Sequence, residues 1–356
     1  MTEGKPGVLR RVVRRIPVLS VVGVLAIALA VGAIAWSNLR SQPASSLLNV
    51  SYSATDEVYQ AINKAFAEDY QRENGTSVTV ETSNGGSGRQ ASAVVDGTER
   101  AGVVSLALPS DVETLVKRGF VDSDWQSRLP NNSAPYTSTV VFLVRKGNPK
   151  AIDDWPDLVK ADVGIVSPDP ASSGVGRLAL LAAWGSVTTR GGTAEQARQY
   201  LTQLYAHVAR FDVSARVATN TFVIDQLGDV QLAWESEAIR DVKNANGDLE
   251  IVYPPVSILA EPPVTLVDKN LDDATEPIAE AYLQYLYSDA AQETYAQLGF
   301  RPRNEDVLAR HADLFPTIEL FPITAIAKDW NDAQTNFFGA DGVVETISAA
   351  QAKPGS

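Results

Sequence analysis

The chain has 356 residues, of which 45% are hydrophobic and 21% are charged, a composition typical of a globular protein with one or two buried cores. It contains no cysteine, which excludes disulfides, thiolate metal sites and lipid-modified cysteines. Its two histidines, His207 and His311, lie in separate helix-like stretches without metal-ligand spacing. We therefore expect no metal, no cofactor and no enzymatic activity. A hydrolase with a triad through one histidine remains an alternative, although no nucleophile turn accompanies either.

The N-terminus reads as a separate module. Residues 1–15 form a basic segment with four arginines, and an uncharged run of 21 residues follows from Ile16 to Trp36. Such a run is long enough to span a bilayer as a helix, and the upstream arginines favour a cytoplasmic N-terminus. We expect a transmembrane anchor at 16–36 and a polar linker at 37–48. The alternative is a cleaved signal peptide, because small residues before Trp36 fit a cleavage pattern.

The charge of the remaining chain is strongly acidic. The first 40 residues hold six Lys/Arg and one Asp/Glu, so the rest carries 24 Lys/Arg against 42 Asp/Glu, a net charge of −18. Such a surface repels nucleic acid and anionic headgroups at long range. We therefore expect no nucleic-acid partner, and any bound anion must be held locally by donors that point inward.

Strand-like and helix-like stretches alternate after the linker. In the first amphipathic stretch, Val58, Ile62 and Phe66 lie on one apolar stripe of a helix. We expect strands at 46–53, 77–83 and 101–108, and helices at 55–74, from 89 onward and at 109–119. Repeated strand–helix units predict a mainly parallel sheet with helices on both faces.

Two long extended stretches divide the chain further. Residues 136–149 lead into a second α/β set, and residues 257–269 lead back before the closing helices at 277–299. Two α/β sets joined by two crossings predict an α/β fold of two hinged lobes. The expected lobe one is 49–138 plus 262–310, lobe two is 139–258, and a helical extension occupies 311–356.

The strand-to-helix turns are the candidate binding elements, because ligands of open α/β sheets bind beyond the carboxyl ends of the strands. The four turns lie within 82–90, 167–185, 213–228 and 230–239. They offer backbone N–H groups, hydroxyls and one indole N–H, with no carboxylate at their tips. Helix N-termini attract anions, so the turns predict a small-anion site. Each turn alone is more often just a turn, and "GGSGRQ" lacks the ending of a phosphate-binding P-loop.

Several short stretches, taken together and in their order along the chain, form a specific sequence pattern. They include "GGSGRQA", "SSGVGR", "SARVATNTF" and "LAWESEA". With them, the chain from about 48 to 350 resembles the bacterial sulfate-binding proteins, the solute receptors of sulfate/thiosulfate ABC importers, which have the two-lobed type II periplasmic-binding-protein fold. The resemblance implies a monomeric extracytoplasmic receptor that captures sulfate and delivers it to permease subunits in the membrane.

The resemblance also implies a sulfate site of uncharged donors. It consists of the backbone N–H groups of Ser53, Ser87, Gly174, Val175 and Ala215, the Ser173 hydroxyl and the Trp234 indole. Three positions depart from the family: Ser53-Ala54 replaces Asp-Pro, Gly102 replaces an acidic residue, and Val175 replaces a glycine. Valine tolerates positive φ poorly, so Val175 is the expected weak point of the site. Thiosulfate or a molybdate-type oxyanion as ligand, and a sulfate-sensing ectodomain, remain alternatives.

Overall fold

The structure, a computed structural model, describes residues 45–351. The predicted anchor at 16–36 therefore lies outside the described residues. Among the helices that the structure does describe, none is long and apolar enough to cross a membrane.

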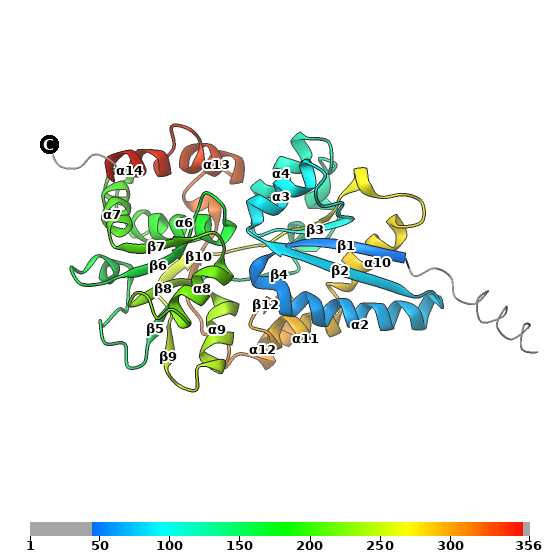
Figure 1. Cartoon of the computed structure of the whole chain (residues 1–356), viewed down its shortest axis with the longest axis horizontal. Coiled ribbons are helices and arrows are strands. Elements are labelled where there is room, and N and C mark those ends of the chain that lie inside the picture. The colour runs from blue at the N-terminus through cyan, green and yellow to red at the C-terminus, as the bar shows by residue number, and fades with distance from the viewer. Residues whose placement is uncertain (1–44, 352–356) are drawn as a thin grey trace, which may run out of the picture. The chain divides into compact units, whose positions relative to one another are not determined.

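The first sheet has four strands in the order β11-β3-β1-β2, of which β3, β1 and β2 are labelled in Figure 1. The strands are β1 (Ser45–Tyr52), β2 (Val78–Gly85), β3 (Val103–Ser105) and β11 (Val264–Leu266). β1 runs parallel to β2 and β3, whereas β11 pairs antiparallel with β3. We call the part of the molecule around this sheet the first lobe.

Helices cover both faces of the first sheet, as the alternation of strands and helices predicted. The helices are α2 (Asp56–Asn74), α3 (Ser87–Val95), α4 (Pro109–Lys117), α10 (Glu276–Tyr285) and α11 (Asp289–Gln297). The predicted stripe of Val58, Ile62 and Phe66 is buried against one face with α10 and α11. α3 and α4 cover the other face, because neighbouring residues such as Val103 and Val104 point to opposite sides of a strand.

The second sheet has five strands in the order β7-β6-β8-β5-β9, and we call its surroundings the second lobe. The strands are β5 (Val140–Arg145), β6 (Ile165–Pro168), β7 (Val208–Asp212), β8 (Val230–Trp234) and β9 (Leu249–Val252). β6 runs parallel to β7 and β8, but β5 is antiparallel to β8 and β9. The expectation of mainly parallel sheets is wrong here, because β5 enters from the other lobe and runs opposite to the strand–helix units that follow.

Four helices cover the second sheet. They are α6 (Gly174–Thr188), α7 (Ala194–Ala206), α8 (Ala215–Val223) and α9 (Glu235–Asn244). α6 and α7 pack on one face with Phe142 and Leu232, and α8 and α9 pack on the other with Val141 and Ala233. Because β6, β7 and β8 run parallel, the strands that precede α6, α8 and α9 end at the same edge of the sheet.

Two extended crossings join the lobes side by side. β4 (Tyr136–Thr137) pairs antiparallel with β12 (Arg301–Pro302), and Ser138 forms a bridge with Ala260 of the return crossing. The remaining short elements are η1 (Ser53–Thr55), η2 (Trp125–Ser127), α5 (Pro130–Ser133), η3 (Trp155–Val159), η4 (Asp268–Asn270) and η5 (Ile323–Ala325).

The C-terminal segment returns to the second lobe. It contains α12 (Glu305–Arg310), β13 (Glu319–Phe321), α13 (Trp330–Phe338) and α14 (Val343–Gln351). β13 pairs with β10 (Val256–Ile258), and Phe337 and Ile347 enter the core around α6 and α7. The segment that we expected to be helical thus also contributes a strand. In Figure 1, α13 lies where the two lobes meet, and it contacts α4 of the first lobe.

Candidate anion-binding site

The predicted site residues occupy the starts of helices. Ser53 begins η1 directly after β1, and Ser87, Gly174 and Ala215 are the first residues of α3, α6 and α8. Trp234 ends β8 and immediately precedes α9. Backbone N–H groups in the first turn of a helix have no intrahelical acceptor, so each start presents donors with partial positive charge.

Two glycines bring these helix starts together across the lobes. A Cβ atom on Gly174 would lie 2.6 Å from Cβ of Ala107 and 3.1 Å from Cβ of Ser87. A Cβ on Gly86 would lie 2.4 Å from the Ser172 carbonyl oxygen. Because no side chain fits in such gaps, Gly86 and Gly174 allow the two lobes to close backbone against backbone.

The other site residues lie at the same junction. The rings of Tyr52 and Trp234, one from each lobe, are 5.7 Å apart in an edge-to-face arrangement. Tyr52 directly precedes Ser53, and η1 packs against α8, which begins at Ala215. The structure thus brings the elements that carry all seven predicted residues to one junction between the lobes.

The Trp234 side chain places an unpaired hydrogen-bond donor at the junction. It is fully buried, and its indole N–H has no hydrogen-bond partner among the described residues. Leaving a buried donor unpaired costs about 1–3 kcal/mol. Ser87, Ser173, Val175 and Ala215 are each at most 2% exposed. The junction therefore encloses a donor that needs an acceptor.

The two serine hydroxyls at the junction have different partners. The Ser87 hydroxyl donates to Oδ2 of Asp111 at 2.6 Å and accepts from the backbone N–H of Ala107 at 2.9 Å. Its hydrogen is used, so Ser87 has only its backbone N–H to offer a ligand. The Ser173 hydroxyl accepts from the backbone N–H of Gly176 at 3.3 Å, as the N-cap of α6. Its own hydrogen is not used in that contact.

Val175 does not have the strained backbone that its replacement of a glycine suggested. Positive φ occurs at seven non-glycine residues among those described, and Val175 is not one of them. It lies in the first turn of α6 with its side chain buried in the second-lobe core. A helical backbone accepts valine, so the expected weak point is absent.

A buried ion pair crosses the lobes behind Ser87. Nη2 of Arg177 on α6 contacts Oδ1 of Asp111 on α4 at 2.7 Å, and both side chains are less than a tenth exposed. Gln334 of α13 accepts from the same guanidinium at 3.3 Å. Asp111 therefore links the Ser87 hydroxyl in the first lobe to the helix that carries Gly174 in the second.

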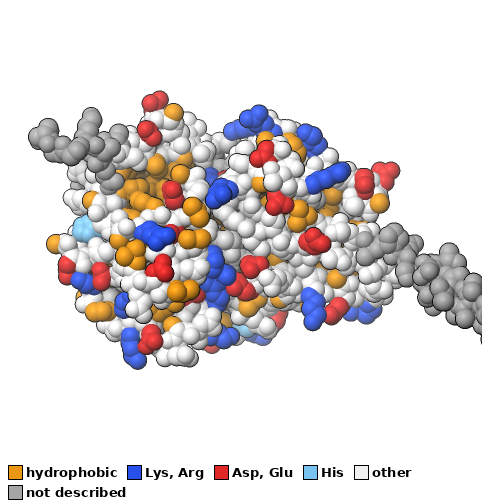
Figure 2. Space-filling view, in the orientation of Figure 1, with side chains coloured by type: hydrophobic (Ala, Val, Ile, Leu, Met, Phe, Trp, Pro, Cys, Tyr) orange, Lys and Arg blue, Asp and Glu red, His pale blue; other side chains and the backbone are white. Residues whose placement is uncertain are grey.

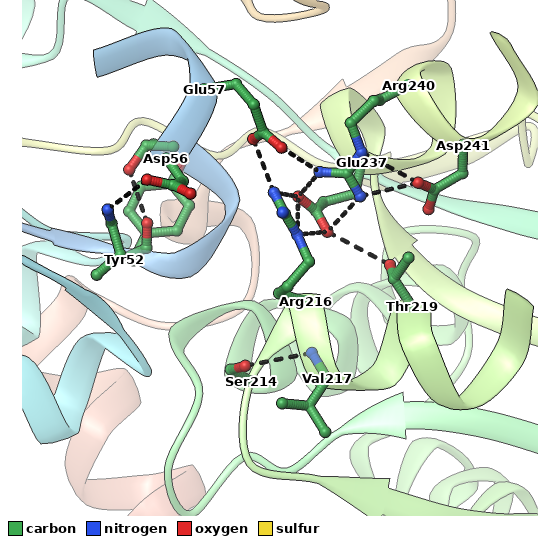
Figure 3. Close-up of polar contacts among 12 residues, drawn as sticks. Tyr52, Asp56, Glu57, Ser214, Arg216, Val217, Thr219, Glu237, Arg240 and Asp241 are labelled. Carbon is green, nitrogen blue, oxygen red and sulfur yellow. Dashed lines mark hydrogen bonds and ion pairs between the residues drawn. The ribbon is translucent and has the colours of Figure 1, made fainter. Parts of the chain in front are cut away.

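A second charged cluster lies behind Ala215 (Figure 3). Arg216 contacts Glu57 of the first lobe at 2.7 Å and Glu237 of α9 at 3.0 Å, and Arg240 contacts Glu237 at 2.6 Å and Asp241 at 2.8 Å. Three carboxylates thus face two guanidiniums, and one of the five groups comes from the other lobe.

The pKa values of Glu57 and Asp241, at the two ends of this cluster, are shifted in opposite directions. Burial acts to raise the pKa of Glu57, but the hydrogen bond from Arg216, a backbone hydrogen bond and the charges of Arg216 and Arg240 together outweigh it, and the pKa is lowered. Burial raises the pKa of Asp241 to about 6, against the opposing effect of Arg240, and its Oδ2 has no hydrogen-bond partner in the described chain. Glu57 is therefore held in its charged form, whereas Asp241 is buried with incomplete compensation.

The histidines lie elsewhere. His207 is the C-cap residue that follows α7, with its Nδ1 2.9 Å from the Val163 carbonyl, and Nε2 of His311 contacts Oε1 of Glu293 at 2.7 Å. Neither belongs to the junction. Within residues 45–351, no group of three His, Asp or Glu side chains is arranged to hold a metal ion.

Sequence reasoning missed the charged residues that support the turns. It examined the tips and found no carboxylate, but Glu57, Arg177, Arg216 and Glu237 lie within the first turns of helices that begin at or beside those tips. A search one helical turn beyond each predicted site residue would have found them. Asp111 carries no such signal, because its contact with α6 depends on how the lobes close.

Comparisons with known proteins agree with this geometry. The family model described as bacterial extracellular solute-binding protein matches residues 47–301. The chain is 47% identical to a sulfate-binding protein of Salmonella typhimurium and 43% identical to a thiosulfate-binding protein of Pseudomonas aeruginosa, in each case over 85% of this chain and 92% of the relative. The solved structure of the sulfate-binding protein SubI from Mycobacterium tuberculosis H37Rv matches with a TM-score of 0.75 at 33% identity, covering 83% of this chain and 99% of that one.

The two lobes and the donors enclosed between them define a solute-binding protein. The chain belongs to the bacterial extracellular solute-binding protein family, in the branch that contains these sulfate- and thiosulfate-binding proteins.

Proposed function

We propose that this protein is the extracytoplasmic receptor of a sulfate importer. It captures sulfate between its two lobes and delivers it to the permease subunits of an ABC transporter. The buried, unpartnered N–H of Trp234 is the observation that supports this most directly, and the identity to the Salmonella typhimurium sulfate-binding protein gives the chemistry of the ligand. The seven predicted residues are the proposed ligand set.

The proposed donors explain a preference for sulfate over phosphate. Sulfate is fully ionised near neutral pH and needs only donors, whereas hydrogen phosphate keeps a proton that needs an acceptor. Backbone amides, the Ser173 hydroxyl and the Trp234 indole donate, and Asp111, the carboxylate beside Ser87, already accepts from Ser87 and Arg177. An unpaired phosphate proton would cost about 1–3 kcal/mol on burial.

Closure of the lobes supplies the charge compensation. A buried divalent anion is tolerated only when many preorganised dipoles converge on it. Ser53 and Ser87 come from the first lobe and the other proposed ligands from the second. The Asp111–Arg177 and Glu57–Arg216 pairs join the same two lobes, so they stabilise the closed form that encloses sulfate.

Thiosulfate is the second candidate ligand. The 43% identity to the Pseudomonas aeruginosa thiosulfate-binding protein favours it, and its three oxygens would accept from the same donors. A molybdate-type oxyanion as ligand and a sensing ectodomain stay as sequence-based alternatives.

The N-terminal and surface properties fit an extracytoplasmic receptor. We propose that residues 16–36 anchor the chain, with residues 1–15 in the cytoplasm and the lobes outside. We also propose that lobe one comprises 49–138 plus 262–310 and lobe two comprises 139–258. The protein is proposed to be a monomer. On the face drawn in Figure 2, Lys and Arg side chains alternate with Asp and Glu, so this face offers no broad basic surface to nucleic acid.

Isothermal titration calorimetry of the purified chain tests the proposal. Sulfate, thiosulfate, molybdate and phosphate are titrated separately at pH 7 and fixed ionic strength. We expect one sulfate per chain and no heat from phosphate. Tighter binding of thiosulfate than of sulfate would make thiosulfate the physiological ligand. Binding of neither would overturn the proposed function.

A further inference from the structure

The Trp234 indole N–H makes no hydrogen bond of good geometry in the described structure, and the polar group near it is the Tyr52 hydroxyl. The ring of Trp234 is buried at the end of β8. The aromatic ring that packs against it belongs to Tyr52, with an interplanar angle of 81°. Edge-to-face pairs of this kind contribute about 0.5–1.5 kcal/mol beyond their buried area. The direction of the indole N–H therefore depends on where the Tyr52 ring lies.

The Tyr52 ring is itself held from behind. Its hydroxyl lies 2.9 Å from the hydroxyl of Tyr136, which belongs to the crossing strand β4. The Tyr136 ring packs between Tyr295 of α11 and Phe300, with ring centroids 4.7 and 5.0 Å away. All four side chains are at most 2% exposed. Burial raises the pKa of both Tyr52 and Tyr136, so both hydroxyls stay protonated and one donates to the other.

We propose that Tyr52 is a positioning residue that aims the Trp234 N–H at the bound oxyanion. The inference rests on the proposed function. Tyr52 comes from the first lobe and Trp234 from the second, so their contact is made across the junction. Tyr52 also directly precedes Ser53, and its position thus couples the first-lobe donor to the second-lobe donor.

A double-mutant cycle in sulfate affinity tests this role. Tyr52→Leu removes the ring, and we expect sulfate to bind about 2- to 13-fold more weakly, the range that the aromatic contact implies. Tyr52→Phe keeps the ring but loses the tether to Tyr136, and a smaller weakening in the same direction is expected. In the Trp234→Phe background the donor is already gone, so Tyr52→Leu should change the affinity by less than about twofold.

The side-chain N–H resonance of Trp234 gives a readout that general loss of packing would not reproduce. It is assigned in the full-length chain by its absence from Trp234→Phe. Sulfate should shift it in the wild type and shift it less in Tyr52→Leu. Tyr282→Phe is the matched control, since Tyr282 is a buried first-lobe tyrosine whose hydroxyl bonds Asn49 and Asn63, away from Trp234. It should leave the shift and the affinity unchanged.

The outcomes separate the two ideas. If the wild type binds no sulfate, the proposed function is wrong and this inference with it. If the wild type binds and Trp234→Phe weakens binding, but the Tyr52 variants bind normally or their effects add to that of Trp234→Phe, only the positioning role is wrong. Should Tyr52→Leu fail to fold, Tyr52→Phe carries the same comparison.

Discussion

The indole of Trp234 is the single side chain on which the site depends most. A hydrogen bond to a charged group contributes about 1.5–3 kcal/mol, so Trp234→Phe should weaken sulfate binding about 10- to 150-fold, measured by calorimetry. Trp155→Phe is a matched control, because the indole of Trp155 is equally buried but donates to the Val256 carbonyl at 2.7 Å. It should lower thermal stability and leave the affinity unchanged. An affinity within about twofold of wild type for folded Trp234→Phe would remove Trp234 from the site.

Asp241 is the residue whose environment makes stability depend on pH. Its pKa is raised from 3.8 to about 6, so between about pH 4 and pH 6 the native protein binds more protons at this group than the unfolded chain does. Its contribution to stability therefore falls as the pH rises through that window, by at most about 3 kcal/mol. Asp241→Asn should remove this fall.

Thermal unfolding of both proteins between pH 4.5 and pH 7.5 measures the effect. The stability of Asp241→Asn relative to wild type should increase with pH up to about 6.5 and then level off. A difference that stays constant across the whole range would show that the buried carboxyl does not titrate there.

At the scale of elements, the sequence predicted those helices whose starts are specified by neighbouring residues. The stripe of Val58, Ile62 and Phe66 predicted α2 to within a residue at its start, and the glycine-rich turn predicted α3 from residue 89, two residues after its observed start at Ser87. The helix starts could be predicted from the sequence because N-caps and glycines act over a few residues. The antiparallel direction of β5 could not be predicted, because pairing between strands from different parts of the chain leaves no local pattern in the sequence. The Asp111–Arg177 contact is missed for the same reason.

Gly174 shows how one helix start serves both folding and closure. Its backbone is helical, so alanine suits the position and should not destabilise the unliganded protein. The added Cβ would collide with Ala107 and crowd Ser87 of the first lobe when the lobes close. Overpacking of this kind costs about 1–3 kcal/mol, so Gly174→Ala should bind sulfate roughly 5- to 150-fold more weakly.

Gly164→Ala is the control for this substitution. A Cβ there would make ordinary contacts, 3.6 Å from Oδ2 of Asp229 and from Cα of Gly228. Calorimetry and thermal unfolding of the two variants separate closure from folding. Unchanged sulfate affinity in Gly174→Ala would mean that the lobes bind the anion without approaching as closely as they do here.

At the scale of the whole molecule, retention or cleavage of the N-terminal module determines whether the protein stays bound to the membrane. A run of 21 uncharged residues without a cysteine to lipidate leads us to expect that the mature protein keeps residues 16–36. It should remain in the membrane fraction of cells after a high-salt wash, detected by immunoblot with N-terminal sequencing of the mature chain. A soluble protein whose sequence begins at Trp36 would establish the cleaved signal peptide instead.

The whole molecule also poses an electrostatic problem, since a chain with a net charge of −18 beyond residue 40 is proposed to bind a divalent anion. The proposed solution uses donors that do not titrate in the physiological range, with the nearby charges paired among themselves. Asp241 titrates within this range, but Arg240, Glu237 and Thr219 around it all belong to the second lobe. Its titration should therefore affect stability more than sulfate affinity.

The pH dependence of sulfate affinity tests this mechanism most directly. The affinity is measured by tryptophan fluorescence titration at fixed ionic strength, from about pH 5.5 to about pH 8.5. Histidine is the side chain whose unperturbed pKa falls inside this window. Uncharged donors predict an affinity that stays within about twofold throughout, with phosphate rejected at every pH. A tenfold fall between pH 6 and pH 8 would show that a titrating cation holds the anion, and the uncharged-donor site would be wrong even with sulfate as the ligand.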